Sequence, residues 1–385
     1  MIKELQLGML NNRWIETKSI VIYGFGVVAR KCIGMLSQDF HIPYIIDNAP
    51  EKIGTVYNGI PVISQAEALM KEERLPIVII GTIGVYKSIS EMLSKAGLKE
   101  YEDYCLLDLF VAEWYWHNRK QVHLVEVHTT ITTRCTLKCK NCNMFMPYYK
   151  NHVDITLENF KEDMDNLFRV ADRIFSVGIL GGEPIINKQL PEMILYLQEN
   201  YGDRIGEISV ITNGTILPDD RLIDVFKRCN VRVHISDYTS TVPYEKRLRE
   251  FESIMADNDI EYRTNSSLVW CDFGFPDNSF NFNNVRNHMM ECFPIFRGIN
   301  DSKLYFCHVA WSAEKCGMYT LQEEDYFDIK KIDKFNEEQV KEFINYSLGG
   351  NEKWSLSLCK LCGGCGVDNK KYVKAGLQAD AGERG

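Results

Sequence analysis

Short apolar segments alternate in this chain with longer segments whose apolar residues recur at helical spacing, and this alternation restricts the fold more than any other feature. The β-branched run 19–23 precedes a helical pattern over 27–36, and further apolar runs follow at 41–46 and 77–80. Strands and helices that alternate at this interval form βαβ units on a parallel sheet. The sequence therefore predicts an N-terminal α/β domain, which we place at residues 1–110.

A second series of strand and helix patterns begins near residue 120. The predicted strands are 126–132, 175–180, 207–212 and 231–235. A long amphipathic helix is predicted between the first two, from Leu157 to Ile174. Polar or glycine-rich residues follow each strand, and in parallel α/β sheets ligands bind beyond the carboxyl ends of the strands. We place this second domain at residues 120–285 and expect its site at those strand ends.

The last third of the chain has a different character. Aromatic and asparagine-rich loops dominate, one helix is predicted at 336–347, and six of the thirteen cysteines lie between residues 286 and 375. We interpret 286–375 as a small domain held together by metal, and we expect the glycine-rich tail at 376–385 to fray.

Composition excludes several classes of function. The 385 residues carry a net charge of −9 and no long basic run, which disfavours nucleic acid as the partner. The chain has neither an apolar run long enough to span a membrane nor a signal peptide, so we expect a cytoplasmic protein. Cysteines in that reducing compartment serve metal, redox or catalytic chemistry more often than disulfides.

Three cysteines directly after a predicted strand, Cys135, Cys139 and Cys142, form the densest group. Their three thiolates are one short of the four that a tetrahedral zinc site or a fully protein-ligated [4Fe-4S] cluster needs. A cluster held by three cysteines keeps one iron open to a substrate or cofactor. The alternative is a zinc knuckle that takes His128 or His152 as its fourth ligand.

This spacing, with Gly181-Gly182-Glu183-Pro184 after the next strand, resembles the radical S-adenosylmethionine (SAM) superfamily over about residues 126–262. The resemblance implies that the three cysteines hold a [4Fe-4S] cluster whose open iron binds SAM. The reduced cluster would cleave SAM to a 5′-deoxyadenosyl radical, which takes a hydrogen atom from the substrate. A flavodoxin- or ferredoxin-type protein is the implied electron donor.

The same resemblance implies the SAM-binding residues. Gly181, Gly182, Glu183 and Pro184 would contact the cofactor, with Glu183 accepting from its amino group. Asn213 would lie near the sugar or carboxylate and Ser236 near the ribose. Many family members have an aromatic residue directly before the third cysteine, and this chain has Asn141 there.

Four C-terminal cysteines, Cys292, Cys307, Cys359 and Cys362, make a complete ligand set. Their order resembles the twitch domain, the short form of the SPASM extension, which holds one auxiliary [4Fe-4S] cluster; Cys365 can replace Cys362 in this set, and structural zinc is the alternative. The cysteines left over are Cys316 and Cys365, which we consider as hydrogen-atom donors.

Near the N-terminus, Gly24 and Gly26 follow a strand and Asp47 ends the next one, the spacing of a dinucleotide-binding fingerprint. Residues 47–54 and 58–64 resemble the Rossmann-type domains attached to sugar-modifying acyltransferases and related saccharide enzymes. The domain could bind a nucleotide sugar or NAD, or serve only for docking.

Together these features predict an α/β protein with a partial (βα) barrel core, an N-terminal Rossmann-like parallel-sheet domain and a small C-terminal Fe-S cluster domain. The favoured function is a radical SAM oxidoreductase that oxidises an alcohol carbon of a saccharide or nucleotide sugar, in sugar or surface-polysaccharide biosynthesis. Epimerisation with a cysteine hydrogen donor and peptide modification are the enzymatic alternatives. A zinc-stabilised nucleotide-sugar binding protein is the alternative outside enzymes.

Overall fold

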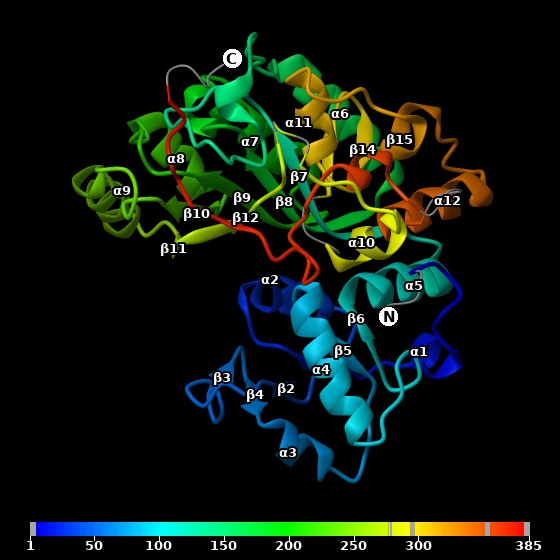
Figure 1. Ribbon diagram of the computed structural model, residues 1–385. Coiled ribbons are helices and arrows are strands. Elements are labelled where there is room, and N and C mark those ends of the chain that lie inside the picture. Colours follow the sequence, from blue (N-terminus) through cyan, green and yellow to red (C-terminus); the bar gives the residue numbers. More distant parts are fainter. Residues whose placement is uncertain (1–4, 276, 278, 293–296, 351–354, 381–385) are drawn as a thin grey trace.

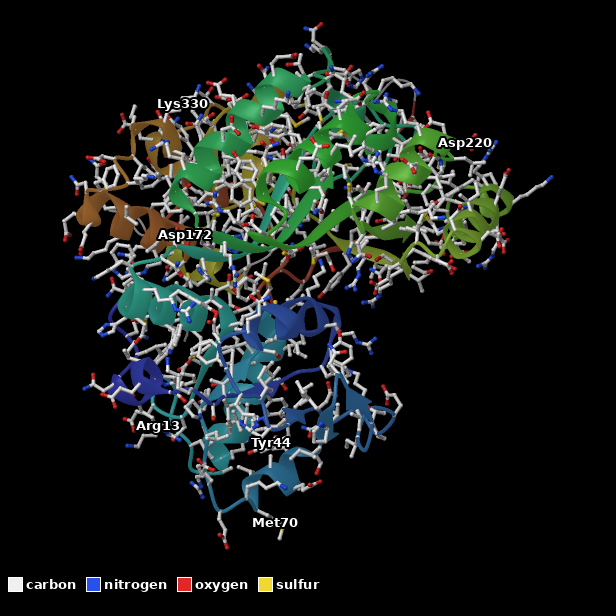
Figure 2. The ribbon with its side chains drawn as sticks, turned by 180° about the vertical axis from the view of Figure 1, so that it is seen from behind. Arg13, Tyr44, Met70, Asp172, Asp220 and Lys330 are labelled. Carbon is white, nitrogen blue, oxygen red and sulfur yellow. The ribbon has the colours of Figure 1, made fainter. Side chains whose placement is uncertain are left out.

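Two lobes make up the molecule in the computed structural model, which describes residues 5–275, 277, 279–292, 297–350 and 355–380. Figure 1 shows the smaller N-terminal lobe in blue and cyan below the larger lobe in green to red. In the view from behind, Arg13, Tyr44 and Met70 lie in the small lobe, whereas Asp220 and Lys330 mark opposite ends of the large one (Figure 2).

The small lobe is built on a six-stranded sheet in the order β3-β4-β2-β1-β5-β6. Its strands are β1 (Val21–Tyr23), β2 (Ile45–Ile46), β3 (Val56–Tyr57), β4 (Ile60–Ile63), β5 (Ile77–Ile79) and β6 (Tyr104–Leu106). Its helices are α1 (Asn12–Glu16), α2 (Val27–Leu36), α3 (Gln65–Leu69), α4 (Ile83–Lys95) and α5 (Leu107–Arg119). All strand pairs except β3 with β4 are parallel. The parallel pairing that the alternating pattern predicts is thus confirmed.

The large lobe contains an eight-stranded sheet in the order β11-β10-β9-β8-β7-β13-β14-β15. Its strands are β7 (His123–Thr130), β8 (Arg173–Leu180), β9 (Ile205–Thr212), β10 (Arg232–Asp237), β11 (Tyr262–Ser266), β13 (Gly298–Asn300), β14 (Lys303–Tyr305) and β15 (Phe327–Asp328). The helices between its parallel strands are α6 (Leu157–Val170), α7 (Leu190–Tyr201), α8 (Asp220–Arg228) and α9 (Glu245–Asp257). Strands β7 to β11 and β13 run parallel, as a partial barrel requires.

Local sequence sets the helix limits. The side chain of Thr156 accepts from Asn159 N at the start of α6, and Asp219 accepts from Leu222 N at the start of α8, so each helix begins at a capping residue. The predicted helix to Ile174 is too long, because Ile174 instead pairs in β8.

The last segments pack around the strand ends of the large sheet. Their helices are α10 (Val285–Glu291), α11 (Val309–Lys315) and α12 (Glu337–Ser347); two short 3-10 turns lie between α11 and α12, and a third follows α12. These turns, together with two more elsewhere in the lobe, are η1 (Met146–Tyr148), η2 (Pro184–Ile186), η3 (Glu323–Asp325), η4 (Ile329–Lys331) and η5 (Ser357–Lys360). Strands β12 (Val269–Cys271) and β16 (Tyr372–Lys374) form a small antiparallel ribbon.

The first half of the tail that we expected to fray, residues 376–380, is hydrogen-bonded to the cysteine loop. Main-chain hydrogen bonds join Lys140 N to Leu377 O and Ala379 N to Lys138 O, both at 2.7 Å, and Ala379 is buried. Residues 375–380 therefore cover the loop of the three central cysteines, while residues 381–385 lie outside the described part of the chain.

A charged cluster at the amino ends of the large sheet joins the lobes. Lys31 on α2 is 7% exposed, and its Nζ lies 3.1 Å from Glu207 Oε1 and 3.4 Å from Glu126 Oε1. Arg232 contacts the other oxygen of Glu207 at 2.9 Å. Because buried charges are costly without partners, this cluster fixes α2 against the strands.

In the described part of the chain, no helix is long and apolar enough to cross a membrane.

Candidate active site

A cavity of about 580 Å³ lies at the carboxyl ends of β7 to β10. Cys135, Cys139 and Cys142 line it together with Gly181, Gly182, Thr212, Asn213, Ser236 and Tyr238. The structure thus brings the three cysteines to the same wall as the polar residues that follow three successive strands.

The loop of the three cysteines is held by polar contacts at its start. Thr132 Oγ1 donates to Asp154 Oδ1 at 2.6 Å, and Arg134 Nε donates to the same oxygen at 3.0 Å. The loop closes with Cys142 N donating to Cys139 O at 3.1 Å. These bonds fix the main chain on both sides of the cysteines without using their sulfurs.

Nitrogen donors point at the cysteine sulfurs. Leu137 N and Asn213 Nδ2 lie 3.4 and 3.5 Å from Cys135 Sγ, and Gln378 Nε2 lies 3.5 Å from Cys139 Sγ. Such donors stabilise negative charge on sulfur, which suits thiolates bound to iron.

Burial of the cysteine sulfurs acts against their charged thiolate form. It raises the pKa of Cys135 and Cys139 to about 12, and the neighbouring thiols add to the effect, so these sulfurs ionise only with a cation beside them. Nowhere among the described residues do three His, Cys, Asp or Glu side chains converge as ligands of one metal ion. Three thiolates are one ligand short of a fully protein-ligated [4Fe-4S] cluster, so this donor set suits a cluster with one open iron.

The two glycines after β8 are required by close approach of the cysteine loop. A Cβ on Gly182 would lie 2.3 Å from Arg134 O and 2.8 Å from Cys135 Cβ, and one on Gly181 would lie 2.6 Å from Thr132 O. Gly182 N and Glu183 N both donate to this loop at 2.8 Å. The main chain at Gly181 and Gly182 is therefore in direct contact with the main chain of the cysteine loop, and side chains at these two positions would separate the segments.

Glu183 lies behind the cavity wall rather than on it. Its Oε1 accepts from Thr212 Oγ1 at 2.7 Å and its Oε2 from Asn213 N at 2.8 Å. Burial raises its pKa to about 7. In this structure Glu183 positions the turn that carries Asn213, and Pro184 is buried at the start of η2.

Asn213, Ser236 and Asn141 do line the cavity. An aromatic wall that no sequence pattern indicated is formed by Tyr238 and Trp270, whose rings meet edge to face at 5.3 Å. The end of β10 pointed to Tyr238, whereas no local pattern connects it with Trp270 on β12.

Five C-terminal cysteines gather beside this cavity. The thiols of Cys307, Cys359 and Cys362 lie near that of Cys292, and burial raises the pKa of all three. Cys365 N donates to Cys292 Sγ at 3.3 Å, and the Cys365 thiol lowers the pKa of Cys292 to about 7.

The two leftover cysteines differ in position. Cys365 lines the main cavity together with Cys271, whereas Cys316 lies outside the cavity wall, with its sulfur 4.0 Å from Phe145 O.

In the small lobe, Gly24, Gly26 and Asp47 come together around the turn after β1. Asp47 accepts from Phe25 N, Ala49 N and Lys52 Nζ at 2.8, 2.9 and 3.0 Å. Gly24 has φ +102°, and a Cβ there would lie 2.5 Å from Ile80 O. These contacts explain the residues as parts of the turn, and a nucleotide is not needed to account for them.

The sheet edge beyond β5 faces the large lobe. The cavity there, lined by Gly81, Thr82, Glu126 and Arg297, measures about 180 Å³. Pockets for drug-sized ligands measure about 300–1,000 Å³, so a whole dinucleotide does not fit this space as it stands.

Fold and site together define a class: an α/β domain in which three cysteines lie at the carboxyl edge of a parallel sheet and line a cavity of small-molecule size. Residues 129–251 match the radical SAM superfamily model, and the chain thus carries a radical SAM domain. Residues 16–102 match a second model, described as C2185-like, N-terminal.

Two curated relatives match segments of the chain. An S-adenosylmethionine-dependent nucleotide dehydratase of Selenomonas ruminantium is 28% identical over 98 residues, which are 26% of this chain and 33% of the relative. A GTP 3′,8-cyclase of Erythrobacter litoralis is 28% identical over 89 residues, 23% of this chain and 26% of the relative. The chain therefore matches about a third or less of each relative's length.

Solved structures with similar folds include BtrN in complex with AdoMet and 2-DOIA, with a TM-score of 0.42 and 15% identity, covering 64% of this chain and 96% of that one. Streptococcus suis SuiB bound to S-adenosylmethionine has a TM-score of 0.31 and 13% identity, covering 78% and 83%.

Proposed function

We propose that this protein is a radical SAM enzyme that abstracts a hydrogen atom from a saccharide-type substrate and oxidises an alcohol carbon. The observation that carries the proposal is that Cys135, Cys139 and Cys142 share one cavity with Gly181, Gly182 and Asn213. A [4Fe-4S] cluster on these sulfurs supplies the electron that cleaves SAM reductively.

The chain's own residues prepare this cavity. Gly181 and Gly182 keep the main chain close to the cysteine loop, and Asn213 donates to both Cys135 Sγ and Thr136 Oγ1. Ser236 and Tyr238 also line the cavity, where a hydroxyl and an aromatic face suit a nucleoside. The tail at residues 375–380, in which Ala375 and Ala379 are buried, lies on the cysteine loop.

The cavity size supports a small substrate. About 580 Å³ is in the range of pockets for small molecules and leaves room for a cofactor beside a sugar-sized group. The two curated relatives are named for reactions on nucleotides, which agrees with a nucleotide-linked saccharide.

Oxidation is favoured over epimerisation because a second cluster beside the cavity would accept the electron of the substrate radical. Cys292, Cys307, Cys359 and Cys362 would hold an auxiliary [4Fe-4S] cluster, and Cys365 connects this group to the cavity wall. Epimerisation is the second candidate, because Cys365 lines the cavity and could return a hydrogen atom to the substrate.

The partner that reduces the cluster would be a flavodoxin or ferredoxin, in the cytoplasm. Arg134 and Lys138, which flank the cysteines, are the basic residues that would meet its acidic surface.

Replacement of Cys135, Cys139 and Cys142 by Ala tests the proposal. We expect reconstituted iron to fall by about four per chain, with loss of visible absorbance and of 5′-deoxyadenosine formation. Cys316→Ala, outside the cavity, is the matched control and should keep both. Unchanged iron in the triple variant would contradict the cluster assignment.

Substrate class and outcome are read in a second experiment. The reconstituted enzyme is incubated without oxygen with deuterated nucleotide sugars, and deuterium in 5′-deoxyadenosine identifies the substrate. A product lighter by two mass units indicates oxidation, whereas uptake of solvent deuterium without another change indicates epimerisation. Deuterium transfer from none of them, with peptide substrates active instead, would refute the saccharide assignment.

A further inference from the structure

Two histidines on the floor of the main cavity have no role in the site described so far. His128 lies on β7 and His308 at the start of α11, and both line the cavity. His308 is 2% exposed, and the His128 side chain is 13% exposed. They approach from segments 180 residues apart in the sequence.

Glycines on both neighbouring strands make room for the two rings. In the sheet register His128 pairs with Gly178 of β8 on one side and with Gly298 of β13 on the other. A Cβ on Gly178 would lie 2.3 Å from His128 Cδ2, and one on Gly298 would lie 2.3 Å from His308 Cγ. The absence of side chains at Gly178 and Gly298, on either side of His128, thus leaves room for the two imidazole rings at one level of the sheet.

Each ring has one nitrogen bound to the protein. His128 Nε2 lies 3.4 Å from Glu126 Oε1, and His308 Nδ1 lies 3.2 Å from Thr130 Oγ1. Glu126 lines the smaller cavity between the lobes, which the His128 ring also touches. These contacts orient both rings and occupy one nitrogen of each.

The second nitrogens, His128 Nδ1 and His308 Nε2, are buried and find no hydrogen-bond partner among the described residues. A buried polar atom without a partner costs about 1–3 kcal/mol, so such atoms are normally satisfied by water or a ligand. The cavity floor around them is otherwise apolar, with Leu180 and Ile211 beside the rings.

We propose that His128 and His308 form a hydroxyl-binding subsite that holds the sugar part of the substrate at the cavity floor. A hydroxyl both donates and accepts, so it satisfies an imidazole nitrogen in either tautomer, and two such nitrogens suit a polyhydroxylated ring. This inference rests on the proposed function, and it adds the residues that select a saccharide over an apolar group.

Calorimetry on the anaerobically reconstituted enzyme with S-adenosylhomocysteine tests the subsite, using UDP-glucose, GDP-mannose and dTDP-glucose as probes. We expect at least one probe to bind, and His128→Leu and His308→Leu to weaken its binding about tenfold each. His128→Asn and His308→Gln place an amide near the unbound nitrogen and should restore binding to within about threefold. Leucine variants that bind as tightly as the wild type, or a wild type that binds none of the probes, would overturn the inference.

His123→Leu is the matched control, because His123 is also buried on β7 with an unpartnered Nδ1 among the described residues but lies outside the cavity. It should leave probe binding unchanged. If a leucine variant does not fold, a crystal structure of the wild type with the bound probe decides: a sugar hydroxyl must lie within hydrogen-bond distance of His128 Nδ1 and His308 Nε2, and a probe bound without these contacts would overturn the subsite.

The proposed function fails separately. A wild type that takes up no iron and cleaves no SAM refutes the radical SAM assignment itself. If the wild type has normal iron content and SAM cleavage, but both leucine variants bind the probe as tightly as the wild type, only the subsite is refuted.

Discussion

Replacing Gly182 by Ala tests how the cysteine loop is positioned. The new Cβ would lie 2.3 Å from Arg134 O and 2.6 Å from its carbonyl carbon. This is about 1 Å closer than van der Waals contact allows, so one main-chain segment has to move by about that distance. Both neighbours are main chain and cannot rotate away.

Overpacking of this kind costs about 1–3 kcal/mol, and here it acts directly on Cys135. We expect Gly182→Ala to fold, with a lower unfolding midpoint, and to lose most of the iron held by the three central cysteines. Iron content and visible absorbance after anaerobic reconstitution measure the effect, with circular dichroism as the check on folding.

Gly26→Ala is the matched control, since a Cβ at Gly26 meets no atom within 4 Å and its φ of −95° suits any residue. It should keep full iron content. If Gly182→Ala takes up as much iron as the wild type, the close approach of the two segments is not what positions the cysteines.

Three further predictions concern the groups around the site. Because burial raises the pKa of Glu183 from 4.5 to about 7, the folded state keeps a proton that the unfolded chain releases, and stability from this group falls as the pH rises between those values. Glu183→Gln removes that dependence, so the unfolding free energy of the wild type should fall by about 3 kcal/mol relative to that of the variant from pH 4.5 to 7. A difference between the two proteins that stays constant with pH in urea titrations would contradict this prediction. Lys31→Met leaves Glu207 with Arg232 and the more distant His234, and it should cost about 3 kcal/mol by urea unfolding, whereas Lys71→Met, at an exposed pair, should cost less than about 0.5 kcal/mol; equal costs would refute the role of the buried cluster. Gln378→Ala removes the donor to Cys139 Sγ and should make visible absorbance decay several-fold faster in air; an unchanged decay rate would show that the tail does not shield the cluster.

The elements of the fold could be predicted because their signals are local. Apolar spacing marks α6 and α8, and capping residues mark their starts. The cysteines at 135, 139 and 142 and the glycines at 181 and 182 follow strands directly, so a parallel sheet brings them to one edge.

The missed features depend on contacts between distant segments. The tail lies on the cysteine loop through bonds between residues 138–140 and 377–379, and Tyr238 meets Trp270 across a loop. The position of His128 depends on Gly298. No sequence pattern connects the two residues, and they lie side by side only through the register of β7 and β13. Such pairings are set by the packing of the whole molecule, so no window along the sequence contains them.

The charged cluster around Lys31 bears on how far the two lobes are separable. Glu126, Glu207 and Arg232 sit inside the large sheet, and the cation that balances the two carboxylates comes from the other lobe. A radical SAM core cut free of residues 1–110 would expose carboxylates with too few cations. Recombination with a different N-terminal module would therefore have to supply a basic residue at the position of Lys31, so the two lobes are not freely exchangeable.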